Sequence, residues 1–347
     1  MITISTGQNR CSRASATRRT SSGSILVAVL GFILVASIMS FVIIERIVSD
    51  IAYRGLHDYR VDLKREGYSG LQAALAVLAE YKELDGTITG PQQGWHNLIA
   101  RADYQPSGSY RVRARVTDET GKIPLNSQDP QLFIALLKHM ELPQTEAEEL
   151  ADKLLDWIDA DDLERNFGAE DDEYERRDPA YRAANRPIRD LSELALIDGF
   201  DETFFDENGT PNGLYDQLLQ HTTLHHSGKI NIHTADRFLL EAIAAMDNTN
   251  LSGLFDYMSG PDGELNTTDD LSLADAQQSP VPDSELFRNL TTDEVAVIQI
   301  EVAVSRGDVG STLNALVNVK ETDSIPTPDG NISLPFKVLA VRENQQF

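Results

Sequence analysis

ILVAVLGFILVASIMSFVII, residues 25–44, carries no charged side chain, and it decides how the rest of the chain is organised. As an α-helix this segment would extend about 30 Å, which matches the hydrocarbon core of a bilayer. The residues before it include Arg10, Arg13, Arg18 and Arg19 and no acid. The positive-inside rule therefore predicts a cytoplasmic N-terminus and export of everything after the helix.

The junction between the basic leader and the apolar segment is Gly23-Ser24. An ordinary secretory signal places its small-residue cleavage site after the apolar segment, where Ser49-Asp-Ile-Ala52 fits poorly. A basic leader that ends in Gly directly before a membrane helix resembles the type IV prepilin class, in which a membrane peptidase cuts after the Gly. This resemblance implies cleavage between Gly23 and Ser24. The alternative is a single-span anchor that is never cut.

Composition restricts the function classes. The 347 residues contain 30 Lys and Arg against 55 Asp and Glu, a formal charge of −25 that loss of the leader's arginines would make more negative. A chain of this charge repels phosphate backbones, so nucleic acid is not an expected partner. The single cysteine, Cys11, lies in the leader. The cut chain would therefore contain neither disulfides nor a Cys-ligated metal.

Hydrophobic spacing predicts an α+β fold. Apolar residues recur at helical intervals after residue 44, and no Pro occurs from Ser24 to Leu84, which predicts one helix of roughly 55 to 60 residues. Strict alternation in Tyr110–Val116 predicts a strand. Further strands are predicted at 296–304, 312–319 and 336–341. The interval between the first and second strands has mostly helical spacing, so one sheet would contain a long helical insertion.

Carboxylates gather in the segment 155–172, which we call the acidic loop. It contains Leu155-Asp-Trp-Ile-Asp-Ala-Asp-Asp162 and Gly168-Ala-Glu-Asp-Asp172. Closely spaced carboxylates repel one another unless a cation or water surrounds them. Spacing alone leaves two interpretations open, a Ca²⁺ site and a solvated acidic loop.

An internal repeat lies within the helical interval. Gly121-Lys-Ile-Pro-Leu-Asn-Ser127 recurs as Gly228-Lys-Ile-Asn-Ile-His-Thr234, and each copy leads into a predicted helix. Such repeats resemble helix-hairpin-helix units, which bind DNA phosphates in other proteins. The strong negative charge argues against that use here, and we interpret the repeats as scaffold or protein-contact units.

Five motifs occur in an order that identifies a family. They are Leu155–Asp162, Gly168–Asp172, Tyr181–Pro187, Leu191–Leu194 and Gly228–Ala235. With the prepilin-like leader, they closely resemble the general secretion pathway protein K family, the K-type minor pseudopilins of type II secretion. The resemblance extends from the leader to the last predicted strand, over almost the whole chain.

The resemblance implies a pseudopilin fold, with a long N-terminal helix on an antiparallel sheet and a large inserted α-helical domain containing the helix-hairpin-helix-like repeats. The expected segments are a prepilin leader at 1–23, a transmembrane helix at 24–44, the pseudopilin helix and first strand at 45–119, the inserted domain at 120–291 and the C-terminal strands at 292–347.

The same resemblance implies a non-enzymatic subunit at the tip of the periplasmic pseudopilus, which helps initiate the filament and export folded proteins. Such a subunit is a single-pass inner-membrane protein with most of its chain in the periplasm. Its implied partners are the I- and J-type minor pseudopilins and the prepilin peptidase, with secreted cargo and the outer-membrane channel as further contacts. We predict that the helix face carrying Ile47, Ile51 and Leu63 contacts the other pseudopilins.

Members of this family bind up to two Ca²⁺ ions through acidic loop residues. The matching positions here are Asp159, Asp161, Asp162, Glu170, Asp171 and Asp172. Ala28, the fifth residue after the predicted cut, replaces the Glu that most pilins use to pair with a neighbour's amine. A subunit with nothing above it has no such amine to neutralise, and a carboxylate in hydrocarbon is costly. Ala28 therefore fits a tip position.

Two other functions remain as alternatives. One is a minor pilin-like subunit of another type IV filament machine, such as one for DNA uptake, which would require a basic surface patch. The other is a membrane-anchored hydrolase that uses the acidic loop, in which Asp159→Ala would abolish activity without affecting assembly. No Gly-rich phosphate loop, nucleophile elbow or catalytic triad pattern is visible in the sequence.

Overall fold

The structure, a computed structural model, describes the backbone of residues 22–346 apart from 227, 266, 268, 308, 328 and 329. Within that range the side chains of 22–28, 47–58, 274, 325–333 and 345–346 are left undescribed. The predicted leader, up to residue 21, thus lies outside the described residues. The chain forms two compact units, Met1–Val61 and Asp62–Phe347.

The first element, α1 (Ser22–Asp85), is a single helix, as its spacing predicts, and its 64 residues make it slightly longer than expected. Its N-terminal part includes Val29–Arg46, which is long and apolar enough to cross a membrane, with a mean hydropathy of 2.1. The helix ends where Gly86 adopts a positive φ of 78°, a conformation that glycine reaches without steric cost.

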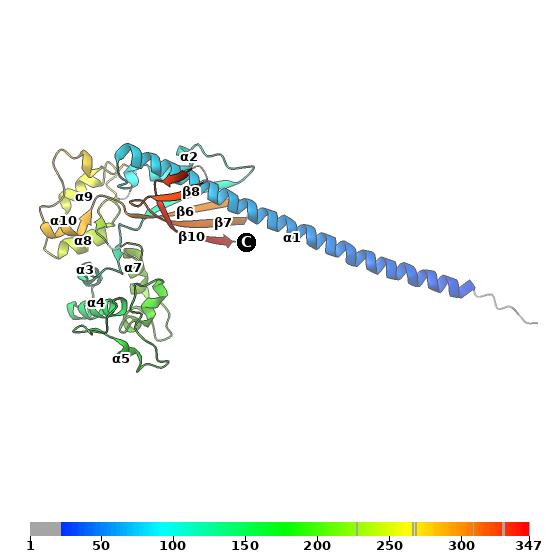
Figure 1. The fold of residues 1–347 in the computed structure, drawn as a ribbon, viewed down its shortest axis with the longest axis horizontal. Coiled ribbons are helices and arrows are strands. Elements are labelled where there is room, and N and C mark those ends of the chain that lie inside the picture. The colour runs from blue at the N-terminus through cyan, green and yellow to red at the C-terminus, as the bar shows by residue number, and fades with distance from the viewer. Residues whose placement is uncertain are drawn as a thin grey trace, which may run out of the picture. The chain divides into compact units, whose positions relative to one another are not determined.

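The second unit contains a four-stranded antiparallel sheet (Figure 1). Its strands are β1 (Arg111–Asp118), β6 (Val297–Arg306), β7 (Val309–Asn318) and β10 (Lys337–Gln346), in the order β1-β6-β7-β10. All four match predicted strands. A hairpin of β8 (Asp323–Thr327) and β9 (Gly330–Leu334) precedes β10 and was not predicted.

The C-terminal part of α1 packs on one face of this sheet. Leu71, Ala74 and Leu78 are buried at helical spacing. The approach is closest at Gly70, where a Cβ atom would lie 2.7 Å from Val112 Cγ1. Leu63 is also buried, at 1% exposure, so its side chain belongs to the core of this unit. The predicted partner-contact face is therefore wrong at Leu63, and the side chains of Ile47 and Ile51 lie outside the described residues.

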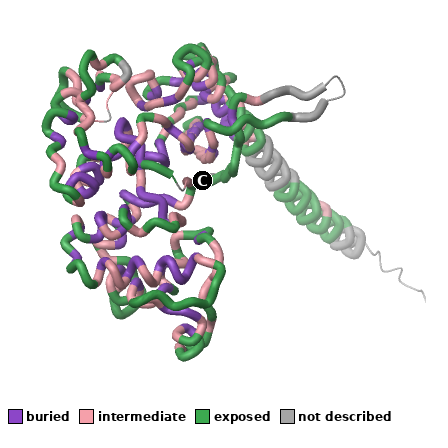
Figure 2. The backbone as a smooth tube through the Cα atoms, turned by 60° about the vertical axis from the view of Figure 1, so that its left-hand side comes forward, coloured by how far each residue is buried: buried purple, intermediate pink, exposed green. Residues whose placement is uncertain are grey.

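Short helices connect α1 to β1, and a series of helices lies between β1 and β6 in the sequence. Those before β1 are η1 (Pro91–Gln93), η2 (Trp95–Asn97) and α2 (Leu98–Arg101). Those after it are α3 (Gln131–His139), α4 (Gln144–Ile158), α5 (Asp171–Tyr174), η3 (Leu191–Leu196), α6 (Phe200–Phe204), α7 (Gly213–His221), α8 (Arg237–Ala245), α9 (Ser252–Met258), η4 (Leu273–Asp275) and α10 (Glu285–Leu290). The helices after β1 enclose a hydrophobic core of their own, and Figure 2 shows its buried segments.

The internal repeat forms two equivalent local structures. In the first copy β2 (Ile123–Pro124) pairs in parallel with β3 (Thr222–Thr223), and in the second β4 (Ile230–Asn231) pairs with β5 (Thr291–Thr292). In the first copy the backbone amide of Leu125 donates to the carbonyl of Thr223 at 2.9 Å. In the second copy the amide of Ile232 donates to the carbonyl of Thr292 at the same distance. Each repeat copy therefore ties the start of one helix to the end of a distant one.

Candidate functional site: the acidic loop

The acidic loop begins in the last turn of α4 and ends in α5, and its first carboxylate is fully buried. Asp156 has no exposed surface, and its Oδ2 accepts a hydrogen bond from the backbone amide of Arg165 at 3.1 Å. The Arg165 guanidinium lies 3.1 Å from both Asp156 Oδ1 and Asp159 Oδ2. Arg165 thus joins two of the carboxylates, although Asp156 Oδ1 receives no hydrogen bond of good geometry.

Glu170 is the acid whose environment is least satisfied. It is 7% exposed, and neither carboxylate oxygen has a hydrogen-bond partner among the described residues. Burial, together with the negative charges of Asp156 and Asp159, raises the pKa of Glu170 to about 7. A buried carboxylate without a donor requires a proton or a cation.

Three of the other acids accept hydrogen bonds from backbone and side-chain donors. Asp161 Oδ1 accepts from the amide of Leu163 at 3.0 Å, and Asp171 Oδ1 accepts from the amide of Ala183 at 3.0 Å. Asp162 Oδ1 accepts from Asn185 Nδ2 at 3.3 Å. The Tyr181–Pro187 motif therefore folds back onto the acidic loop.

A hollow of about 290 Å³ brings four of the six predicted ligands together. It is lined by Asp162, Glu164, Glu170, Asp171, Asp172, Glu173 and Arg176. Asp159 and Asp161 are not among its lining residues, although both raise the pKa of Glu170. Within the described part of the chain, no three His, Cys, Asp or Glu side chains are already arranged to hold a metal ion.

Hard oxygen donors nevertheless suit Ca²⁺, and the carboxylate of Glu170 is free to bind one. Sequence reasoning overlooked a further oxygen, Asn185 Oδ1, which is buried without a partner. Asn185 also has a positive φ of 44°, an uncommon conformation that places it in a tight turn. Its position in the Tyr181–Pro187 motif was the signal that could have identified it.

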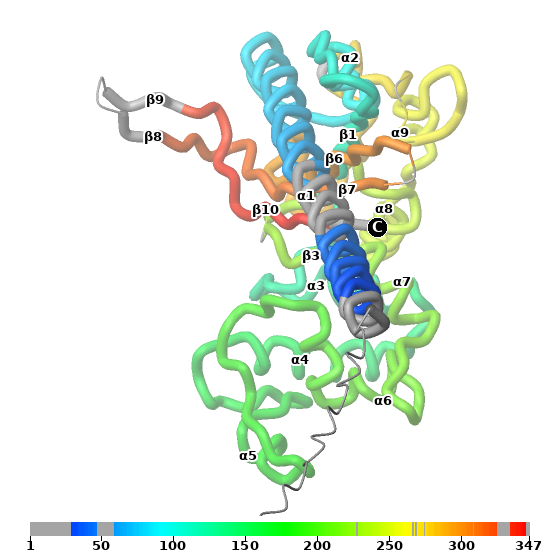
Figure 3. Tube along the Cα trace, turned by 90° about the vertical axis from the view of Figure 1, so that its right-hand side faces the viewer, coloured from blue at the N-terminus to red at the C-terminus, as the bar shows by residue number. Residues whose placement is uncertain are grey.

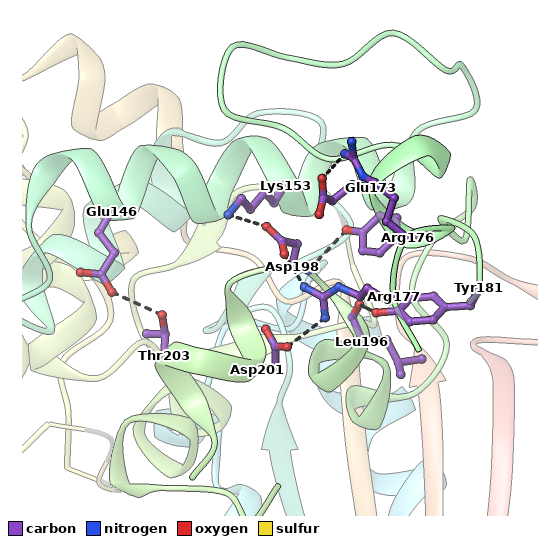
Figure 4. A network of polar contacts seen from close by, with 11 residues as sticks. Glu146, Lys153, Glu173, Arg176, Arg177, Tyr181, Leu196, Asp198, Asp201 and Thr203 are labelled. Atoms are coloured by element: carbon purple, nitrogen blue, oxygen red, sulfur yellow. Dashed lines mark hydrogen bonds and ion pairs between the residues drawn. The ribbon is translucent and has the colours of Figure 1, made fainter. Parts of the chain in front are cut away.

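A network of polar contacts, which includes one tyrosine, lies next to the acidic loop (Figure 4). Asp198 accepts from Arg177 and lies 2.7 Å from Lys153 Nζ, while Arg177 also contacts Asp201 at 2.9 Å. Tyr181 donates to the carbonyl of Leu196 at 2.7 Å. These contacts connect α4 and the segment that follows α5 with η3 and α6, so the residues on both sides of the acidic loop share one set of polar contacts.

The acidic loop lies in the part of the chain whose sequence is similar to known proteins. Residues 112–207, which include the acidic loop, match the family model described as "Type II secretion system (T2SS), protein K". Type II secretion system protein K of Pseudomonas aeruginosa is 36% identical over 96 residues, and that of Klebsiella pneumoniae is 33% identical over 94 residues. These alignments cover 25% and 27% of this chain and 29% and 28% of the relatives, so less than a third of each relative is matched.

The fold is similar to a solved structure over a much greater length. A chain from the GspK–GspI–GspJ complex of the type 2 secretion system of enterotoxigenic Escherichia coli superposes with a TM-score of 0.57 at 19% identity. The match covers 84% of this chain and 99% of that chain. The helix, the antiparallel sheet and the helices between β1 and β6 thus form one shared fold. Within that fold, residues 112–207 match the type II secretion system protein K family.

Proposed function

We propose that this chain is a minor pseudopilin, a structural subunit at the tip of the type II secretion pseudopilus that helps initiate the filament and export folded proteins from the periplasm. The observation that carries the proposal is α1, a single helix that begins with a membrane-length apolar segment and ends packed on an antiparallel sheet. The apolar part is stored in the membrane until it packs against other pilin helices. The match of residues 112–207 to the type II secretion system protein K family favours type II secretion over a DNA-uptake filament.

Processing tests this function directly. A pseudopilin must be cut between Gly23 and Ser24 before its helix can enter a filament. In a host lacking its own copy, the wild-type chain should begin at Ser24 by mass spectrometry and restore secreted enzyme in the medium. Gly23→Leu should remain uncut and fail to restore secretion, with Leu30→Ile as a matched change in the same segment. An uncut wild-type chain that supports secretion would disprove the pseudopilin role.

The proposed partners are the I- and J-type minor pseudopilins. The solved complex with the similar fold contains GspI and GspJ, which supports the same assembly here. Full-length chains co-expressed in one membrane and extracted in detergent should co-purify in a one-to-one-to-one ratio. Recovery of this chain alone, while I and J co-purify with each other, would contradict the partner proposal. Contacts with cargo, the prepilin peptidase and the outer-membrane channel belong to the same proposal.

The acidic loop is proposed to bind Ca²⁺, up to two ions, through Asp159, Asp161, Asp162, Glu170, Asp171 and Asp172. The unpartnered carboxylate of Glu170 supports this assignment. Bound Ca²⁺ would neutralise the repulsion among these carboxylates and hold the loop against the Tyr181–Pro187 segment. We propose no catalytic role for the loop, and the named relatives are secretion-system proteins.

Calcium binding is tested by thermal unfolding of the full chain. At free Ca²⁺ about 100 times the dissociation constant, one site adds about 2.7 kcal/mol to the free energy of unfolding. The melting temperature should therefore rise with Ca²⁺ relative to EDTA. Glu170→Gln should remove most of the rise, whereas Glu202→Gln, at an exposed position, should retain it. An identical melting curve in Ca²⁺ and EDTA would show that the loop is merely solvated.

The proposed location is the inner membrane, with the N-terminus in the cytoplasm and the second unit in the periplasm. The apolar segment and the arginines before it support this orientation. External protease added to spheroplasts should digest the second unit and leave a small N-terminal fragment protected. Protection of the whole chain until lysis would contradict the proposed topology.

A further inference from the structure

Three arginines form a row on β1, and no acid among the described residues contacts them. Arg111, Arg113 and Arg115 alternate with Val112 and Ala114, so their guanidinium groups lie on one face of the strand. All three are exposed, and within the described residues none forms an ion pair or a side-chain hydrogen bond. In contrast, the other arginines often contact carboxylates, as Arg65, Arg165, Arg177, Arg186, Arg237 and Arg288 do.

The strand that carries this row is at the edge of the sheet. β1 pairs with β6 along its whole length, and no other strand in the described chain pairs with it. An edge strand presents backbone N–H and C=O groups that a further strand can bind. Arg111, Arg113 and Arg115 stand opposite Ser305, Ala303 and Glu301 of β6, so only one acid faces the row from its neighbour.

A groove lies between β1 and the segment of η2 and α2, both of which contact β1. Its volume is about 750 Å³, and four consecutive β1 residues, Val112–Arg115, line it. The opposite wall comes from His96–Ala100, with Tyr104 and Gln105, and Glu301 is the one acid among the lining residues. Figure 3 shows α2 and β1 side by side, with β6 on the other side of β1. The groove therefore combines positive charge with backbone groups that can form hydrogen bonds.

We propose that this arginine edge binds an extended, acidic segment of a protein partner by strand addition to β1. Cross-strand neighbours on one face interact, so acids at alternate positions of the partner would pair with the three arginines. The intervening partner residues would be apolar, to lie beside Val112 and Ala114, which are half-buried. The expected ligand is thus an alternating acidic and β-branched segment. This proposal does not depend on the pseudopilin role.

The backbone groups of the strand edge favour an extended peptide over other anions. A formal charge of −25 opposes every anion at long range, but it opposes a peptide with three carboxylates less than a nucleic acid with its many phosphates. A phosphate-bearing lipid surface would neutralise guanidinium groups but could not satisfy the directional N–H and C=O groups of a strand edge. An extended peptide satisfies both requirements.

The test uses the full chain in detergent and a fluorescent peptide, acetyl-Ser-Glu-Val-Glu-Val-Glu-Ser-amide, followed by fluorescence anisotropy. Arg111→Gln, Arg113→Gln and Arg115→Gln combined should weaken binding by about tenfold or more, because three cross-strand charge pairs are lost. The matched control combines Arg65→Gln, Arg237→Gln and Arg288→Gln, which changes the net charge equally at exposed arginines that already have carboxylate partners. It should bind nearly as the wild type does.

A second peptide, N-methylated at alternate amides, separates strand addition from charge attraction, because it retains every carboxylate but cannot complete the hydrogen-bond ladder. It should bind markedly more weakly. Equal binding of the methylated peptide would overturn strand addition. So would an equal loss in the two triple variants, or displacement of the peptide by short-chain phosphatidylglycerol at lower concentration than by unlabelled peptide. Melting curves of both variants should match the wild type, which excludes misfolding as the cause.

Discussion

Asp118, the last residue of β1, joins the sheet to the second repeat copy. Its Oδ2 accepts from Asn231 Nδ2 at 2.8 Å and from Thr234 Oγ1 at 2.6 Å, and its Oδ1 accepts from the amide of Thr120 at 2.7 Å. The partners Asn231 and Thr234 are more than 100 residues away in sequence, so spacing could not have revealed this role. The alternating pattern predicted the strand, but only the fold shows that its last residue binds the second repeat copy.

Removing the Asp118 carboxylate should leave the amide of Thr120 and the hydroxyl of Thr234 without this acceptor, whereas Asn231 Nδ2 keeps its hydrogen bond to the carbonyl of Thr89. Such groups cost about 1 to 3 kcal/mol each when unsatisfied, so we expect Asp118→Ala to lower the free energy of unfolding by about 3 kcal/mol. Urea unfolding of the full chain in detergent measures this difference. Asp256→Ala, at an exposed position, is the control and should change stability by less than about 0.5 kcal/mol. Equal stability of the two variants would show that Asp118 is not a junction.

Asp118 also gives the fold a dependence on pH. Burial, opposed by its hydrogen bonds from Thr234 and Asn231, raises its pKa from 3.8 to about 6. The folded state therefore holds this proton more tightly than the unfolded state does. The contribution to stability is fully present below about pH 4 and is lost as pH rises through about 6, a change of about 3 kcal/mol.

Unfolding free energies measured from pH 4 to pH 7 test this linkage. Glu170 contributes a change of the same sign as pH rises toward 7, because its pKa is also raised. The comparison is therefore between the wild type and Asp118→Asn, which cannot titrate at this position. The wild type should lose more stability than the variant across this range. If the unfolding free energies of the two proteins change in parallel with pH, the pH dependence comes from other residues.

At the scale of elements, helix α1 and the sheet are the most predictable parts of the molecule. Their patterns are strong because each element has one buried face and one exposed face. The β8–β9 hairpin was missed because residues 323–335 contain three prolines, which count against a strand in any sequence pattern. The acidic loop was predicted as a cluster, but its contacts with Arg165 and Asn185 depend on how two loops return and could not be read from spacing.

Two glycines one turn apart on α1 give a matched test of how closely the helix approaches the sheet. At Gly67 the nearest atoms to an added Cβ are 3.8 Å away, an ordinary contact, whereas at Gly70 Val112 Cγ1 and Val302 Cγ1 would lie at 2.7 and 3.0 Å. Gly67→Ala should stabilise the fold by about 0.5 to 1 kcal/mol, because alanine loses less conformational entropy in a helix. Gly70→Ala should destabilise it by about 1 to 3 kcal/mol through overpacking.

Thermal or urea unfolding of the two variants side by side checks this difference in sign. Both substitutions add one methyl group to the same helix, so helix propensity cancels in the comparison. Similar effects of the two variants would mean that α1 does not rest on β1 and β6 at Gly70.

At the scale of the whole molecule, two features argue for a single copy at a filament end. The interval from β1 to β6 holds well over half of the second unit, and so large an insertion is difficult to repeat along a narrow helical fibre. Ala28 in turn lacks the carboxylate that would neutralise the amine of a subunit above it. Charge adds to this, because strongly acidic copies stacked side by side would repel one another.

We therefore expect this chain to be far less abundant in filaments than the major pseudopilin. Sheared filaments from a host that expresses all subunits can be quantified by mass spectrometry with isotope-labelled peptides. The expected ratio is well below one copy per ten major subunits, falling further as filaments lengthen, because a tip is present once per filament. Ala28→Glu is a second test of the tip position. The added carboxylate should make insertion of the helix into the membrane less favourable, without raising the copy number of the chain in filaments. Parity with the major subunit, or a ratio independent of filament length, would refute a tip position and place the chain along the shaft.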